Sequence, residues 1–122
     1  MNGKTVIVGV SPNQTRYSFA AAELLLENQI EFVPIGMKRG SVLGRPILDI
    51  RTKPVIEDVE TITFYIRPEL QSSWQDYLIS LKPKRMIFNP GTENNEFEQM
   101  AESVGIEVIE ACTLVMLRTG QY

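Results

Sequence analysis

The sequence predicts an α/β protein built on a mostly parallel five-stranded sheet with helices on both faces. Short apolar runs rich in β-branched residues alternate with segments whose apolar residues recur every three or four positions. The first run, Thr5 to Val10, is continuously apolar, which is typical of a parallel strand covered on both sides. Right-handed crossovers between parallel strands place the connecting helices on both faces. The sequence therefore predicts a Rossmann-like three-layer fold.

Composition limits the class of protein. The chain has 122 residues, 43% of them hydrophobic, which predicts one domain over residues 1–122 with its own core. The formal net charge of −3 provides no global positive field, so we expect neither a nucleic-acid partner nor an anionic membrane surface. One cysteine cannot form an internal disulfide, and no apolar run is long enough to span a bilayer. A cytoplasmic location is the resulting expectation.

The first strand leads through Gly9-Val10-Ser11-Pro12 into a predicted helix. Alanines and leucines recur there at helical spacing, Thr15 or Ser18 can cap the helix start, and Asn28 can end it. A second strand, Glu31 to Ile35, follows at once. The segment from Gly36 to Val59 is punctuated by glycine and proline and is expected to be mostly loop, with short structure only at Val42-Leu43 and at Ile47 to Ile50.

The second half of the chain repeats the alternation of strand and helix. A strand over Thr61 to Ile66 precedes a helix that begins at Pro68, and the apolar stripe of that helix is predicted to face the core. Its members are Leu70, Trp74, Tyr77, Leu78 and Leu81. A strand over Arg85 to Phe88, a helix stopped by Gly105 and a strand over Ile106 to Ile109 complete the series.

The turn after the first strand is a candidate anion site. Ser11, Asn13 and Thr15 can donate hydrogen bonds, and Arg16 adds a forked cation suited to phosphate. The turn has one glycine and lacks the G-x-G-x-x-G set of dinucleotide-binding loops. A polar turn that only satisfies its own backbone is the alternative interpretation.

Two arginines are predicted beside helix N-termini at the same edge of the sheet. Arg16 precedes the first helix and Arg67 precedes the second. A cation there meets the positive end of the helix dipole, so a bound anion would explain the placement. For Arg67, an ion pair with Glu69 or simple solvation is the slightly favoured explanation.

The end of the second strand discriminates between nucleotides. Enzymes that use nicotinamide dinucleotides usually carry a carboxylate there for the adenosine ribose, whereas this chain has Lys38 and Arg39 between two glycines. The two cations favour a ribose that carries its own phosphate, as in NADP or coenzyme A. An exposed basic loop without a ligand is the alternative.

Seven short segments, taken in order, resemble the small stand-alone CoA-binding domain proteins. Those proteins are similar to the N-terminal CoA-binding domain of the succinyl-CoA synthetase α subunit, and the resemblance covers nearly the whole chain. It implies a Rossmann-like fold that holds coenzyme A. The segments are Val8-Gly9-Val10-Ser11, Arg16-Tyr17-Ser18, Val33-Pro34-Ile35, Val42-Leu43-Gly44, Arg67-Pro68-Glu69, Asn89-Pro90-Gly91 and the late Cys112.

The resemblance implies a cofactor-binding role for fourteen residues. The first group surrounds the CoA pyrophosphate, the second lies near the 3′-phosphate, the third borders the adenine and the fourth flanks the pantetheine. They are Gly9, Ser11, Asn13 and Arg16 with the adjoining Tyr17 and Ser18; Lys38 and Arg39; Ile66, Arg67 and Pro68; and Asn89, Pro90 and Gly91.

The sequence offers no recognisable catalytic constellation. It contains no histidine, which excludes histidine bases, catalytic triads and histidine metal ligands. Cys112 has no basic neighbour in sequence that would favour its reactive thiolate form, so we expect a buried, inert thiol. Glu93, Glu96 and Glu98 fall in the first turns of a predicted helix, where acidic residues complement the dipole.

The favoured hypothesis is therefore a protein that binds coenzyme A or an acyl-CoA without catalysis. An NADP-type nucleotide-binding oxidoreductase or sensor is the first alternative. A protein-interaction module with a vestigial nucleotide pocket is the second. The apolar tail from Leu114 to Leu117 would be an exposed patch if it does not fold onto the sheet, which makes a homodimer a further expectation.

Overall fold

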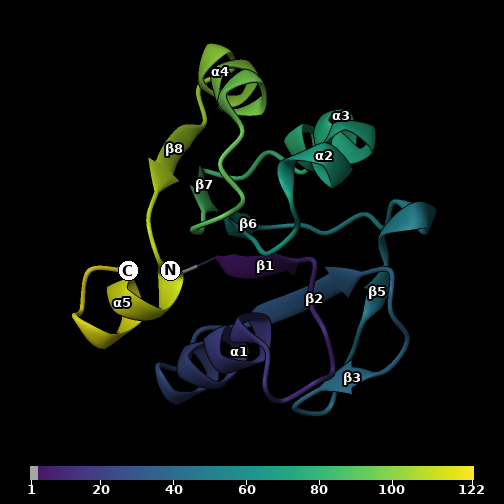
Figure 1. Cartoon of the computed structure of the whole chain (residues 1–122), viewed down its shortest axis with the longest axis vertical. Helices are drawn as coiled ribbons and strands as arrows, with labels where there is room; N and C mark the ends of the chain where they lie inside the picture. The colour runs from purple at the N-terminus through teal and green to yellow at the C-terminus, as the bar shows by residue number, and fades with distance from the viewer. Residues whose placement is uncertain (1–2) are drawn as a thin grey trace.

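A parallel sheet forms the middle layer of the computed structural model, which describes residues 3–122 (Figure 1). Every pair of neighbouring strands in this sheet is parallel. In spatial order the strands are β5 (Leu48–Asp49), β2 (Phe32–Gly36), β1 (Lys4–Val8), β6 (Val59–Phe64), β7 (Arg85–Phe88) and β8 (Glu107–Glu110).

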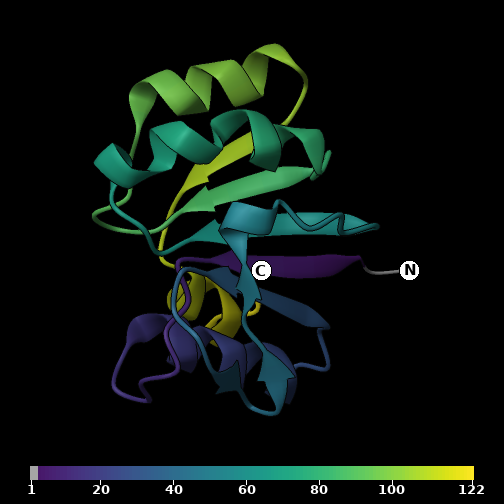
Figure 2. The same cartoon turned by 90° about the vertical axis from the view of Figure 1, so that its right-hand side faces the viewer.

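Helices cover both faces of the sheet (Figure 2). On one face α1 (Tyr17–Glu27) and α5 (Thr113–Arg118) pack on a cluster that includes Ile7 and Phe32. The opposite face carries a near-continuous helical segment and a further helix over the larger core cluster. These are α2 (Pro68–Gln71), the 3-10 turn η2 (Ser72–Trp74), α3 (Gln75–Ser80) and α4 (Asn95–Ser103). The predicted Rossmann-like α/β fold is confirmed.

The sheet has six strands rather than the five predicted. The extra strand, β5, comes from the segment expected to be mostly loop and pairs with Ile35 and Gly36 of β2. The same segment contains a small hairpin, β3 (Ser41–Val42) and β4 (Arg45–Pro46), and the 3-10 turn η1 (Ile50–Thr52). Two-residue strands are too short to show an alternating pattern, so only their tertiary partners define them.

The second crossover helix is also less regular than predicted. Its middle turn is the 3-10 segment η2, and a 3-10 turn has about 3.0 residues per turn, which rotates the apolar stripe. Tyr77 and Leu78 are buried in the core as expected. Leu70, expected in the same stripe, is 52% exposed and faces the carboxyl edge of the sheet instead.

The apolar tail folds as helix α5 against α1. Leu114, Met116 and Leu117 are buried within the chain, and Val115 is the exposed member of the set. The condition for an exposed patch, a tail that does not fold onto the sheet, is not met, because the amphipathic tail covers the sheet and α1. The possible exposed patch was the basis for expecting a homodimer. Because the tail packs within the chain, it provides no support for that expectation. Within residues 3–122, every helix is too short or too polar to cross a bilayer.

The acidic residues at the start of α4 have structural roles. Asn94 caps the helix, since its Oδ1 accepts from the Phe97 backbone N–H at 3.2 Å, and the Asn94 N–H donates to Glu98 Oε2 at 2.9 Å. Glu93 Oε1 accepts from the backbone N–H of Gly91 at 2.8 Å. Burial raises the pKa of the Glu98 carboxyl above its usual value, and the neighbouring carboxyl of Glu110 adds to the shift.

Replacing Glu98 with glutamine is expected to raise stability at neutral pH. A carboxyl with a raised pKa holds its proton more tightly in the folded protein, so its ionisation opposes folding. That unfavourable contribution grows as pH rises above the usual glutamate value of 4.5 and is absent well below it. Urea unfolding should therefore show a Glu98→Gln advantage at pH 7 that narrows at pH 5. Glu96→Gln, an exposed carboxyl in the same turn, is the control, and an equal gain in both variants would contradict the prediction.

Candidate functional site

The crevice at the carboxyl ends of β1 and β6 is the topological switch point of the sheet. The chain leaves β1 towards α1 on one face and leaves β6 towards α2 on the other. In open α/β sheets, ligands bind at this place. Gly9 occupies it with φ +88°, and a Cβ built there would lie 2.1 Å from Ile66 Cγ2. The two strand ends therefore approach so closely that only glycine fits.

The loop between β1 and α1 is held together by its own polar groups. Ser18 Oγ accepts from the Ser11 backbone N–H at 3.2 Å, and Ser11 Oγ accepts from the Asn13 N–H at 3.1 Å. Asn13 Oδ1 accepts from the backbone N–H of Thr15 at 2.9 Å and from its hydroxyl at 2.8 Å. Three predicted ligand residues thus order the loop, which leaves the side chains of Arg16 and Tyr17 exposed.

Arginines occupy the N-cap positions of two helices that converge on this crevice. Arg16 is the N-cap of α1 and Arg67 is the N-cap of α2, and neither side chain makes a capping hydrogen bond. The favourable N-cap residues are Ser, Thr, Asp and Asn, such as the Asn94 that caps α4. Arginine at an N-cap offers no side-chain acceptor to the first backbone N–H groups and adds a cation to the positive end of the dipole.

These arginines and Lys38 line one cavity of about 410 Å³, here called the central cavity. The salt bridges found among residues 3–122 join Arg51 to Asp49 and Lys84 to Glu60, so all three cations lack a carboxylate partner. Unpaired cations beside free helix N-termini are the arrangement that binds phosphate or another anion. The two arginines therefore lie at one sheet edge, as the sequence indicated.

Two further cavities adjoin the central one. The Trp74 cavity, about 390 Å³, shares Gly9, Val10, Lys38, Ile66 and Leu70 with it. The Cys112 cavity, about 370 Å³, shares Tyr17 and Tyr65 with it on the other side. Together the three form a carboxyl-edge trough with a cationic middle and two more apolar ends. The ends are lined by Met37, Ile50 and Trp74 on one side, and by Pro90, Leu114 and Val115 on the other.

Exposed apolar side chains gather along this trough. Tyr17 is 74% exposed, Met37 56%, Val115 54% and Leu70 52%, and each lines at least one of the three cavities. Each would lose contact with water under a ligand that filled the trough. Apolar surface of this kind commonly marks a binding groove.

Tyr65 provides an unsatisfied donor at the junction of two cavities. Its hydroxyl is the buried side-chain polar atom that lacks a hydrogen-bond partner within residues 3–122. Burial raises the pKa of Tyr65, while the nearby hydroxyls of Thr113 and Thr63 oppose the shift. The phenol is therefore protonated at neutral pH and able to donate. A buried polar group without a partner costs about 1–3 kcal/mol, which a ligand acceptor would offset.

Asn89 lines the Cys112 cavity, but its amide is fully used by the fold. Nδ2 donates to Thr63 Oγ1 at 2.7 Å and to the Phe64 carbonyl at 2.8 Å. Oδ1 accepts from the Thr113 backbone N–H at 2.8 Å. Asn89 therefore ties β7 to β6 and to the start of α5.

Ten of the fourteen residues that were predicted from the sequence to bind a cofactor line the trough. They are Gly9, Ser11, Arg16, Tyr17, Ser18, Lys38, Ile66 and Arg67 in the central cavity, and Asn89 and Pro90 in the Cys112 cavity. Asn13, Arg39, Pro68 and Gly91 do not line it. Arg39 instead contributes to the lowered pKa of Asp49, which is due mainly to hydrogen bonds from Arg51.

Several residues that line the trough were not predicted from the sequence to bind a ligand. Leu70 and Trp74 were assigned to the core by their helical spacing, and Tyr65 and Arg118 carried no motif. Met37 directly follows a strand at the binding edge, and that position was the available signal for it. Cys112, expected to be buried, is half-buried and lines the cavity named after it.

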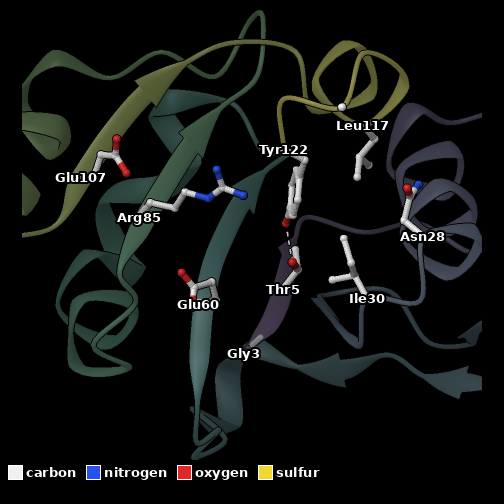
Figure 3. A pocket seen from close by; sticks show the side chains of 10 residues that line it. Gly3, Thr5, Asn28, Ile30, Glu60, Arg85, Glu107, Leu117 and Tyr122 are labelled. Carbon is white, nitrogen blue, oxygen red and sulfur yellow. Dashed lines mark hydrogen bonds between the residues drawn. The ribbon is translucent and has the colours of Figure 1, made fainter. Parts of the chain in front are cut away.

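A fourth cavity, about 410 Å³, lies at the opposite, amino edge of the sheet (Figure 3). The Tyr122 side chain crosses it, with its hydroxyl hydrogen-bonded to Thr5 and its ring 4.4 Å from the Arg85 guanidinium carbon. Arg85 Nε also donates to Thr61 Oγ1 at 2.8 Å. These contacts join the last residue to the sheet, far from the glycine turn. No set of three His, Cys, Asp or Glu side chains suited to a metal occurs within residues 3–122.

Fold and trough together define a Rossmann-like α/β protein with an anion-binding arrangement at its switch point. The family model described as "CoA binding domain" matches residues 3–118. The chain therefore belongs to the CoA-binding domain family. Among curated proteins, the comparison returned no match.

Solved structures share this fold. A protein described as uncharacterized is 49% identical, with a TM-score of 0.95 over 100% of this chain and 99% of its own. A hypothetical protein from Pyrococcus horikoshii OT3 is 24% identical, with a TM-score of 0.82 over 97% of this chain and 83% of its own. A Thermus thermophilus protein is 18% identical, with a TM-score of 0.83 over 98% and 91%. The last two support the fold alone.

Proposed function

We propose that this protein binds coenzyme A or an acyl-CoA in the carboxyl-edge trough and catalyses no reaction on it. The observation that carries the proposal is the pattern of the trough, in which three unpaired cations and two uncapped helix N-termini separate two apolar ends. Coenzyme A has the same order of chemistry: an adenine ring, phosphates and an uncharged pantetheine arm.

Each part of the ligand has a fitting set of residues. Arg16, Arg67 and the adjoining backbone N–H groups would hold the pyrophosphate, and Lys38 would reach the 3′-phosphate. The Trp74 cavity would take the adenine against Ile66 and Leu70. The pantetheine would run past Tyr17 and Tyr65 towards the Cys112 cavity, where its amides can accept from the Tyr65 hydroxyl.

An NADP-type ligand is supported less well. It also has a phosphorylated ribose, but its second nucleotide needs polar partners where the Cys112 cavity is lined mainly by apolar side chains. The single glycine of the β1 turn and the loop ordered by Ser11 and Asn13 also differ from a dinucleotide-binding turn. A vestigial interaction module would leave the three cations and the buried Tyr65 hydroxyl without partners.

A thermal-shift panel of CoA, acetyl-CoA, NADP, NADPH, NAD and ADP tests this proposal. A ligand at 100 times its dissociation constant stabilises the folded state by about 2.7 kcal/mol. We expect CoA or acetyl-CoA to raise the melting temperature most. A calorimetric titration with that ligand then measures its affinity. A larger shift with NADPH would favour the oxidoreductase alternative. No shift with any member at millimolar concentration would overturn the proposal and favour the interaction module.

A further inference from the structure

The Cys112 cavity has one charged lining residue, Arg118. Its other lining residues are neutral, and most are apolar or aromatic: Tyr17, Tyr65, Pro90, Leu114 and Val115, with Asn89 and Cys112. No carboxylate among residues 3–122 lines this cavity. An apolar wall with one cation is a different environment from the central cavity, where three cations gather.

Arg118 has no acidic partner in the part of the chain that the structure describes, since the salt bridges there involve Asp49 and Glu60. It lies in the last turn of α5, where a cation interacts favourably with the helix dipole. That interaction involves the positive charge of Arg118 but leaves the N–H donors of its planar guanidinium group available for hydrogen bonds. A carboxylate, like a phosphate, matches the guanidinium group by two parallel hydrogen bonds.

The position of Arg118 in the trough identifies which part of a ligand it would meet. The Cys112 cavity joins the central cavity only on the side of Tyr17 and Tyr65, away from the Trp74 cavity. If phosphates occupy the central cavity and adenine the Trp74 cavity, the sulfur end of the ligand enters the Cys112 cavity. A group attached to that sulfur is therefore the part that contacts Leu114, Val115 and Arg118.

We propose that this cavity selects a short acyl group with a terminal carboxylate, so that the physiological ligand is a dicarboxylic acyl-CoA thioester. The methylene groups pack on Leu114 and Val115, and the carboxylate binds the Arg118 guanidinium. This inference rests on the proposed function, because it uses the CoA orientation given above. A neutral acyl group would pack on the same apolar side chains but would not bind the Arg118 guanidinium.

Hydrolysis-resistant thioethers of CoA test the inference without the instability of a thioester. S-(2-carboxyethyl)-CoA and S-(3-carboxypropyl)-CoA are compared by calorimetry with S-propyl-CoA and S-butyl-CoA. Since Arg118 is exposed, we expect a carboxylated ligand to bind roughly five- to tenfold more tightly than its neutral counterpart at low salt. The ratio of the two affinities is the measured quantity, so a uniform change in CoA binding does not affect it.

Arg118→Gln is expected to bring this ratio close to one. Lys82→Gln is the matched control, because Lys82 is an exposed cation just after a helix end and lines none of the trough cavities. The control should keep the ratio of the wild-type protein. A ratio near one in the wild-type protein, or a ratio that persists in Arg118→Gln, overturns the inference while CoA binding itself stands. If no CoA derivative binds, it is the proposed function that fails.

Discussion

Replacing both Arg16 and Arg67 with glutamine is expected to lower the affinity for CoA by about one to two orders of magnitude. Each arginine is an exposed, unpaired cation at the rim of the central cavity, and solvent screening reduces the contribution of such a contact to about 1–1.4 kcal/mol. Two such losses together amount to roughly 2–3 kcal/mol of binding free energy.

The same double variant should be as stable as the wild-type protein, or more stable, when no ligand is present. A cation at a helix N-terminus opposes the dipole by about 0.3–1 kcal/mol, and both arginines are N-cap residues. Calorimetric titration with CoA and thermal unfolding of the free protein measure the two effects separately. Arg39→Gln with Lys82→Gln gives the same change in net charge outside the trough and should retain binding. Loss of stability in the Arg16 and Arg67 variant would show that these side chains support the fold instead.

Replacing Gly9 with alanine is expected to destabilise the fold by about 2–5 kcal/mol. A residue with φ near +88° pays about 1–2 kcal/mol for a Cβ in the left-handed region. The new Cβ would also lie 2.1 Å from Ile66 Cγ2 and 2.9 Å from the Tyr65 carbonyl carbon, and such overpacking costs about 1–3 kcal/mol more. The loss of close contact between β1 and β6 would also distort the central cavity.

Gly105→Ala provides the matched control for this prediction. Gly105 also has φ +88°, but a Cβ there would meet no atom within 4 Å, so only the backbone penalty applies. Urea unfolding of both variants, analysed with a common slope, isolates the contribution of the close approach. Equal losses of stability in the two variants would mean that the ends of β1 and β6 move apart around the new Cβ without a further loss of stability. CoA binding should be lost in Gly9→Ala and retained in Gly105→Ala.

The alternation of strand and helix could be predicted because each core element carries its own period. The run from Thr5 to Val10 and the helix around Phe97 and Ala101 bury residues at the spacings seen in the sequence. Short structure at Ile47 to Ile50 was predicted, but not the two-residue strand β5 within it, because the pairing of β5 with Ile35 and Gly36 is its only definition. Helix α5 was missed for a similar reason: Leu114 and Leu117 form one face only when α1 and the sheet lie beneath them.

The residues of the candidate site also fall into those that could be predicted from the sequence and those that could not. Arg16, Arg67 and Lys38 were nominated because each follows a predicted strand, and the carboxyl ends of parallel strands meet at one edge. Leu70 was misassigned to the core because the 3-10 turn η2 changes which side of the helix faces the sheet, whereas Trp74 packs against the core as expected and also lines a trough cavity. Tyr65 and Arg118 joined the site only through the packing of β6 and α5.

The sequence by itself determined the Rossmann-like layers, the cationic residues at strand ends and the absence of histidine chemistry, because these follow from local period and residue type. Tertiary structure decided the rest. It placed two helix N-termini with arginine at the N-cap position beside one cavity, used Asn13 and Asn89 in hydrogen bonds that hold the fold, and extended the trough to Arg118. These outcomes depend on contacts between segments far apart in the chain, and such contacts leave no signal in local spacing.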